Sequence, residues 1–164
     1  MLRRPRGVRQ SSSSEASDCI RDRFPIEGKE YQWAKPKRHI VARKNGLAVG
    51  HIGFGRFQLC GSKDIDVIGV GGVVVRPEFQ GQKVPKKMFN ALQATTELDA
   101  DKILKTLFCP HRLIPYYKGH NFEVYPGSVQ FFQSGVYTKS EKFTLMFRGE
   151  LSCSGGIKIP SCPW

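Results

Sequence analysis

The sequence of 164 residues predicts one mixed α/β domain, in which strands build a sheet and helices flank it. Residues 65–75 form an apolar run, and a helical apolar face with a four-residue repeat begins at Val84. These two patterns indicate a buried strand that leads through a short turn into a helix. Upstream, the Asn45-Gly46 pair separates two alternating segments and indicates a β-hairpin.

The N-terminal residues 1–18 predict a disordered basic tail, which leaves residues 19–164 as the single domain. The tail is rich in arginine and serine, and Pro5 and Gly7 interrupt any helix. It has no apolar stretch of the kind that a secretory signal needs, so we expect a cytoplasmic protein. Arg- and Ser-rich starts also resemble mitochondrial transit peptides, and that compartment stays open.

The charge balance narrows the classes of partner. Lysine and arginine total 26 against 14 acidic residues, which gives a net charge of +12 and suits an anionic ligand. The basic residues are spread along the chain and no nucleic-acid motif appears, so nucleic-acid binding is a weaker alternative. No apolar run reaches the roughly 18–20 residues that span a bilayer. The five cysteines and four histidines lack metal-ligand spacing, so we expect free thiols and no metal.

The pattern of residues 38–54 predicts both strands of the hairpin and the type of its turn. Ile40 and Ala42 alternate with more polar neighbours, and Asn45-Gly46 suits a type I′ turn, whose two central residues both need a positive φ. The returning strand runs to Phe54 and contains glycines that would bend or bulge it.

Residues 65–92 are the centre of the prediction. The strand is apolar on both faces, so it should lie inside the sheet and not at its edge. The helix that follows spans about 84–98, and Pro85 fits its first turn, where an N–H is not needed. Because the first N–H groups of a helix have no intrahelical partner, this strand–turn–helix unit predicts an anion-binding site.

The remaining apolar segments complete the sheet. Residues 103–109 predict a second buried strand. A patch at 129–132 and the clean alternation of residues 143–147 predict closing strands, the latter as the last one, followed by a tail at 149–164.

The turn after the central strand carries a family resemblance. The stretch from Val75 to Pro85 is similar to the acetyl-CoA motif of the GNAT superfamily of N-acetyltransferases, which reads V-x-P, two residues, then Arg or Gln, two residues, Gly, one residue and Gly or Ala. Lys83 and Pro85 stand at the last two motif positions. The resemblance implies a mostly antiparallel twisted sheet with splayed central parallel strands, and acetyl-CoA as co-substrate. The implied acetyl-CoA contacts are Val73, Val74, Val75, Gln80, Gly81, Gln82, Lys83 and Val84.

A second stretch resembles another element of the same superfamily. Tyr116-Tyr117 on a predicted short helix, followed by Asn121 and Phe122, is similar to the aromatic-Tyr pair that precedes Gly and an aromatic residue. The resemblance implies that Tyr117 is the general acid for the leaving thiolate, because a held phenol can protonate it. The alternative is that both tyrosines only pack. Asn121 would adopt the left-handed conformation.

The C-terminal Pro-Trp pair is similar to the ending of the aminoglycoside 2′-N-acetyltransferase-like branch. That likeness implies that Trp164 lies by the acceptor pocket. Superfamily members also open with a segment that covers the acceptor site, which makes Trp33 the second residue expected to bind the acceptor amine. The implied reaction transfers an acetyl group to a primary amine of a small molecule, with aminoglycoside-like amines among the candidates.

The general base is the least defined group. The superfamily often carries a Glu where this chain has Gly71, and Asp66 is the candidate on the same strand, with the Trp164 carboxylate as an alternative. The competing hypothesis is a GNAT-fold protein that has lost catalysis and acts as a CoA-binding or interaction module. A homodimer stays open.

Overall fold

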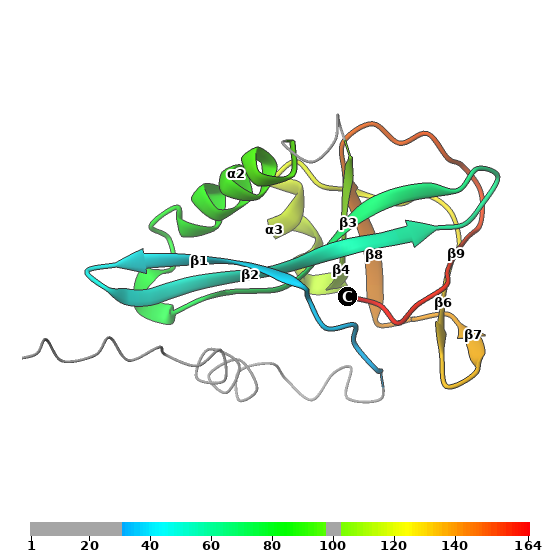
Figure 1. Cartoon of the computed structure of the whole chain (residues 1–164), viewed down its shortest axis with the longest axis horizontal. Helices are drawn as coiled ribbons and strands as arrows, with labels where there is room; N and C mark the ends of the chain where they lie inside the picture. Colours follow the sequence, from blue (N-terminus) through cyan, green and yellow to red (C-terminus); the bar gives the residue numbers. More distant parts are fainter. Residues whose placement is uncertain (1–30, 98–102) are drawn as a thin grey trace, which may run out of the picture.

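The computed structural model describes residues 31–97 and 103–164 (Figure 1). The predicted tail at 1–18 and the first part of the predicted domain lie outside the described residues. None of the helices within the described part of the chain is long and apolar enough to cross a membrane.

Six strands form the main sheet in the order β1-β2-β3-β4-β8-β5. Their bounds are β1 (Arg38–Lys44), β2 (Leu47–Leu59), β3 (Ile65–Val75), β4 (Leu104–Pro110), β8 (Phe143–Arg148) and β5 (Glu123–Val124). All neighbours are antiparallel except β3 and β4, which are parallel. The mixed α/β fold with a mostly antiparallel sheet is confirmed, and so is the internal position of β3.

The predicted hairpin joins β1 to β2. Asn45 and Gly46 have φ values of 50° and 79°, the two positive angles that a type I′ turn requires. Lys44 pairs with Leu47 across the turn.

A second sheet of three short strands has the order β7-β6-β9, with β6 (Val129–Gln133), β7 (Val136–Thr138) and β9 (Ile157–Ile159). The expectation that residues 143–147 form the last strand is wrong, because β9 follows in the predicted tail and pairs parallel to β6. Ile157 and Ile159 are buried there. A strand of three residues is too short to give a readable alternation.

The helices are α2 (Val84–Glu97) and α3 (Ile114–Lys118), with 3₁₀ turns at Pro77–Phe79 and His111–Leu113. Both α-helices lie on one side of the main sheet, and the segment that leads into β1 leaves on the other side (Figure 1). Pro85 is the second residue of α2, as predicted.

The central strands therefore have two distinct faces. On the helix face, Ile52, Phe54, Ile68 and Val70 share a core with Met88 and Phe89 of α2. The opposite face, called the rear face below, is lined by small residues and carries the C-terminal residues: a Cβ built on Gly53 would lie 2.7 Å from Pro36, and one on Gly69 would lie 2.5 Å from the Trp164 ring.

Candidate active site

The two central strands separate along their length. β3 and β4 pair only at Val67–Leu104, Ile68–Lys105 and Gly69–Thr106. Beyond these pairs β3 continues to Val75 alongside β2, and β4 continues to Pro110 alongside β8. We call this separation, between residues 70–75 and 107–110, the fork. The splayed parallel strands that the sequence resemblance implied are confirmed.

The turn between β3 and α2 is tied to β2 and to itself. The backbone N–H and the side-chain Nε of Arg76 donate to Val49 O (2.9 Å) and Ala48 O (2.7 Å). Gln82 Nε2 donates to Glu78 O at 2.9 Å, which closes the turn on its own backbone. These bonds hold the turn where β3 ends.

Two residues of this turn have left-handed backbone angles. Gly81 has φ +75° and Lys83 has φ +59°. A Cβ built on Gly81 would meet nothing within 4 Å, so the backbone of the turn is open to a ligand. The positive φ at Lys83 explains why the GNAT motif prefers glycine at this position. A residue with a side chain is destabilised by about 1–2 kcal/mol in this conformation.

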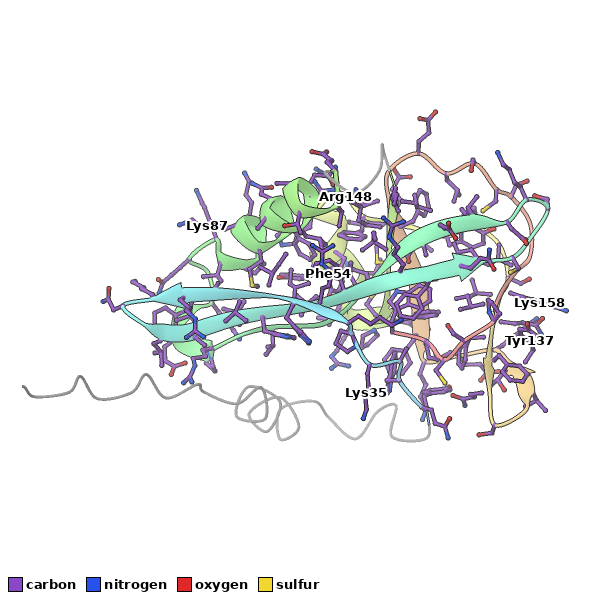
Figure 2. The ribbon with its side chains drawn as sticks, viewed as in Figure 1. Lys35, Phe54, Lys87, Tyr137, Arg148 and Lys158 are labelled. Atoms are coloured by element: carbon purple, nitrogen blue, oxygen red, sulfur yellow. The ribbon has the colours of Figure 1, made fainter. Side chains whose placement is uncertain are left out.

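The start of α2 is basic. Lys83, Lys86 and Lys87 are all exposed, and Lys44 donates to Gln82 Oε1 at 3.3 Å from the neighbouring hairpin. Figure 2 shows Lys87 on the α2 side of the β1–β2 pair and Lys35 on the opposite side. Ammonium groups beside unpaired helix N–H groups attract a diphosphate.

Tyr117 lies in the core of the helix face. It is 7% exposed, and its ring lies edge-on to Phe89 of α2 and Phe122, with centroids 6.4 and 5.9 Å away. Burial, followed by the nearby Tyr116 and Cys109, raises the pKa of Tyr117 far above its ordinary value. The phenol therefore stays protonated at any physiological pH. Asn121, four residues on, has φ +63° and adopts the predicted left-handed conformation.

Trp164 lies on the rear face at the base of the fork. Its indole Nε1 donates to Thr106 O at 3.1 Å, its ring stacks on Phe57 with centroids 4.2 Å apart, and it is 5% exposed. Thr106 belongs to the last pair that joins β3 to β4. The ring therefore caps the point where the two strands part.

Trp33 belongs to an aromatic cluster on the same side of the sheet. Its ring lies edge-on to Phe143 (5.1 Å) and Tyr31 (6.2 Å), and it is 40% exposed. Ala34 N–H donates to Pro163 O at 2.7 Å, which joins this segment to the C-terminal residues. The structure thus brings the elements that carry Trp33 and Trp164 together, although the two residues are far apart in sequence.

The two β3 positions considered for the general base, residues 66 and 71, lie on opposite faces of the sheet. Asp66 is exposed, pairs with Gln58 near the start of β3, and has the strand parity of Ile68 and Val70, which belong to the helix face. Gly71 lies on the rear face, where a Cβ would be 3.0 Å from the main-chain carbonyl carbon of Trp164. Asp66 is therefore outside the fork, and a side chain at residue 71 would press against the main chain of Trp164.

A pair of histidines, for which the sequence pattern indicates no role, lies on the rear side of the hairpin. His51 Nδ1 lies 2.8 Å from Gly72 O, and His51 Nε2 lies 2.9 Å from His39 Nδ1. Gly72 has φ +57°, in the section where the β2–β3 register shifts between His51 and Gly53. The register of the predicted hairpin could have placed the two histidines on one face, but nothing in the sequence indicates the bond to β3.

A model of the acetyltransferase (GNAT) family matches residues 8–122, more than half of the chain. The chain belongs to the acetyltransferase (GNAT) family. Among solved structures, Escherichia coli ElaA is similar, with a TM-score of 0.56 and 19% identity over 85% of this chain and 93% of ElaA. The Escherichia coli GNAT family N-acetyltransferase YhbS, solved in complex with CoA, gives a TM-score of 0.51 and 14% identity over 77% of this chain and 68% of YhbS. At these identities the structures support the fold alone. No curated protein sequence gives a significant match.

As a GNAT enzyme, the chain is an acyltransferase that uses an acyl-CoA as its co-substrate. Nothing in these matches supports the narrower resemblance to aminoglycoside 2′-N-acetyltransferases. The geometry fits an acyl-CoA: the fork leaves the edge of β3 without a β4 partner beyond Gly69, and the turn at Gly81 exposes backbone beside three lysines. Among the described residues, no group of three or more His, Cys, Asp or Glu side chains could hold a metal ion.

Proposed function

We propose that this GNAT enzyme transfers an acetyl group from acetyl-CoA to a primary amine of a small molecule. The observation that carries the proposal is the fork, which begins at Gly69 and leads directly to the basic turn before α2. One edge of β3 is then available for main-chain pairing, and the turn is available for the diphosphate. A thioester supplies the activated acyl group.

The contacts proposed for acetyl-CoA follow this path. Val73, Val74 and Val75 form the end of β3 along the fork. The turn from Gln80 to Lys83 and the first helical residue Val84 come next on this path. The N–H groups of Gln80 and Gln82 donate to Pro77 O and Phe79 O within the turn, so the groups proposed for the diphosphate are the N–H groups of Gly81, Lys83 and Val84 and the Lys83 ammonium. Pro85 has no N–H, so this cradle has one backbone donor fewer than a helix that begins without proline.

The proposed acid is Tyr117. Its phenol lies on the helix face, near Cys109 at the end of β4, and burial, which raises its pKa, keeps it protonated. It can therefore donate a hydrogen bond to the sulfur of the departing thiolate, which is the role proposed for the general acid. The acceptor amine must reach the thioester from the other face, since α2 and α3 cover the helix face. Trp33 and Trp164 are the proposed acceptor-side residues, because both belong to elements that pack on that face.

The acceptor class follows from the charge near these residues. Lys35 projects from the segment that carries Trp33 (Figure 2), and the Trp33 ring packs against Tyr31 and Phe143 beside it. A polycation such as an aminoglycoside would meet lysine here, whereas an amine with one charge and an apolar body would find matching surface. We therefore propose small aromatic or aliphatic monoamines ahead of aminoglycosides.

The test begins with acetyl-CoA binding, measured by calorimetry for the wild type and for Lys83→Glu. The matched control is Lys63→Glu, which makes the same charge change on an exposed loop before β3. We expect Lys83→Glu to weaken binding about tenfold or more and Lys63→Glu about twofold or less. Equal weakening in both variants would contradict a diphosphate site at this turn.

Free-thiol release is then measured with a panel of monoamines, diamines and aminoglycosides. The proposal predicts the highest kcat/KM among the monoamines. Acetyl-CoA binding without thiol release for any amine would favour the alternative of a CoA-binding module.

A further inference from the structure

We infer that His51, oriented by His39, is a positioning residue for the acyl transfer, because it fixes the peptide between Gly72 and Val73 so that the Val73 N–H points into the fork. The inference rests on the proposed function, since it assigns a role to a backbone donor beside the proposed thioester site. It concerns two side chains on strands that the family motif does not include.

The hydrogen-bond pattern places a proton on Nδ1 of His51. A carbonyl oxygen can only accept, so His51 Nδ1 carries a proton and donates to Gly72 O at 2.8 Å. In the neutral ring Nε2 then has a lone pair, and it accepts from His39 Nδ1–H at 2.9 Å. Burial lowers the pKa of His51 and the neighbouring His39 adds to this effect, while the hydrogen bond to Gly72 opposes it; the net lowering favours the neutral ring. The hydrogen bonds therefore run in one direction, from His39 to His51 and from His51 to Gly72 O on β3.

The geometry of the peptide between Gly72 and Val73 relates these hydrogen bonds to the fork. The C=O of Gly72 and the N–H of Val73 belong to one planar trans peptide and point in opposite directions. Because the carbonyl points toward the His51 ring on β2, the N–H points away from β2, to the side of β3 where β4 diverges. Pairing with β4 ends at Gly69–Thr106, so β4 offers this N–H no strand partner at that level.

The backbone of Gly72 explains why a fixing residue is needed. Its φ of +57° and the register shift opposite Ile52 interrupt the regular ladder between β2 and β3. A peptide outside a regular ladder can rotate unless a side chain holds it. A Cβ built on Gly72 would lie 3.4 Å from the His51 ring, so the ring packs directly against this residue.

The expected chemical effect is on the thioester carbonyl. A fixed N–H donor stabilises the negative charge that develops on a carbonyl oxygen during acyl transfer, and losing one such donor lowers kcat about 10²–10³-fold. Hydrogen bonds in a chain also polarise one another, so donation by His51 strengthens donation by Val73. Misorientation without removal of the donor should have a smaller effect, about 10–100-fold.

The test uses two nearly isosteric variants. His51→Asn keeps an N–H donor near the Nδ1 position, whereas His51→Leu has a similar shape and no donor. We expect His51→Leu to lower kcat about 10–100-fold and His51→Asn to stay within about threefold of wild type, with the KM for acetyl-CoA unchanged in both within about twofold. A merely structural role would move both variants together, and equal kcat values for Asn and Leu would overturn the inference.

A second measurement needs no turnover. In the ligand-free protein, the amide proton shift of Val73 should move in His51→Leu and stay near the wild-type value in His51→Asn. An unchanged Val73 shift in His51→Leu would overturn the inference whatever the activity. If the wild type lacks transferase activity while the shift moves as expected, the proposed function fails and the positioning of this peptide by His51 stands.

Discussion

Gly69→Ala tests how closely Trp164 packs on the rear face. A Cβ at residue 69 would lie 2.5 Å from both the Trp164 ring and the Phe57 ring, far closer than carbon atoms approach. Overpacking of this kind destabilises by about 1–3 kcal/mol. If the indole moves aside, its bond to Thr106 O is also lost, which adds about 1 kcal/mol. We expect a loss of about 2–4 kcal/mol in the free energy of unfolding.

Gly55→Ala is the matched control. Gly55 pairs with Gly69 across β2 and β3, but its Cβ would approach the Phe57 ring only to 3.3 Å. Alanine loses less conformational entropy than glycine when a strand folds, which should stabilise both variants by about 0.5–1 kcal/mol. The difference in unfolding free energy between the two variants therefore measures the clash. We expect Gly55→Ala to stay within about 1 kcal/mol of wild type. Urea unfolding followed by circular dichroism measures both.

A double-mutant cycle makes the assignment to Trp164 specific. Trp164→Ala alone should cost about 3–5 kcal/mol, and it leaves a cavity that can accept the new methyl group. The combined variant Gly69→Ala/Trp164→Ala should therefore be about 2 kcal/mol more stable than the sum of the single effects predicts. Additive effects, or equal losses for Gly69→Ala and Gly55→Ala, would refute the packing described for the fork.

Three further predictions concern the turn, the acid and the histidines. Lys83→Gly should raise the free energy of unfolding by about 1 kcal/mol, because it relieves a positive φ, yet weaken acetyl-CoA binding through the lost charge; calorimetry and urea unfolding separate the two. Tyr117→Phe should lower kcat about 10²-fold or more, while the exposed-side control Tyr116→Phe stays near wild type in thiol-release assays. The pKa values of His51 and His120 are lowered by burial, so the unfolded chain takes up protons first as the pH falls through 6.5. The free energy of unfolding should therefore be highest above pH 6.5 and should fall toward pH 5. The fall should be less steep in His51→Asn, and an equal slope in this variant and the wild type would contradict the prediction.

The fold was readable from sequence where one local rule decides. Asn45-Gly46 fixed the hairpin because few residue pairs accept two positive φ angles. The apolar run of β3 indicated an internal strand because both of its faces are buried. Neither rule applies to β9, whose three residues are held by a parallel partner 28 residues earlier in the chain.

The site was only partly readable for a related reason. The motif at Gln80–Val84 is local, so its position could be predicted, and the structure adds that Gly81 and Lys83 have left-handed angles. The contact between His51 and Gly72 depends on the register shift between β2 and β3, which involves no unusual residue type. The C-terminal residues, almost a hundred positions away in sequence, occupy the space next to Gly71. The sequence alone therefore does not indicate that a side chain at this position would be crowded.

The glycines of the rear face connect these observations. Gly53 and Gly71 pair across β2 and β3, and Gly69 lies on the same face two residues before Gly71. Their missing side chains let Pro36 and Trp164 lie directly on the strands. The main chain and rings of two terminal segments thus cover the part of β3 where the family often carries a carboxylate. Polar groups for the amine side must then come from outside β3, and the histidine on β2 that bonds to Gly72 O acts on the fork through the peptide between Gly72 and Val73.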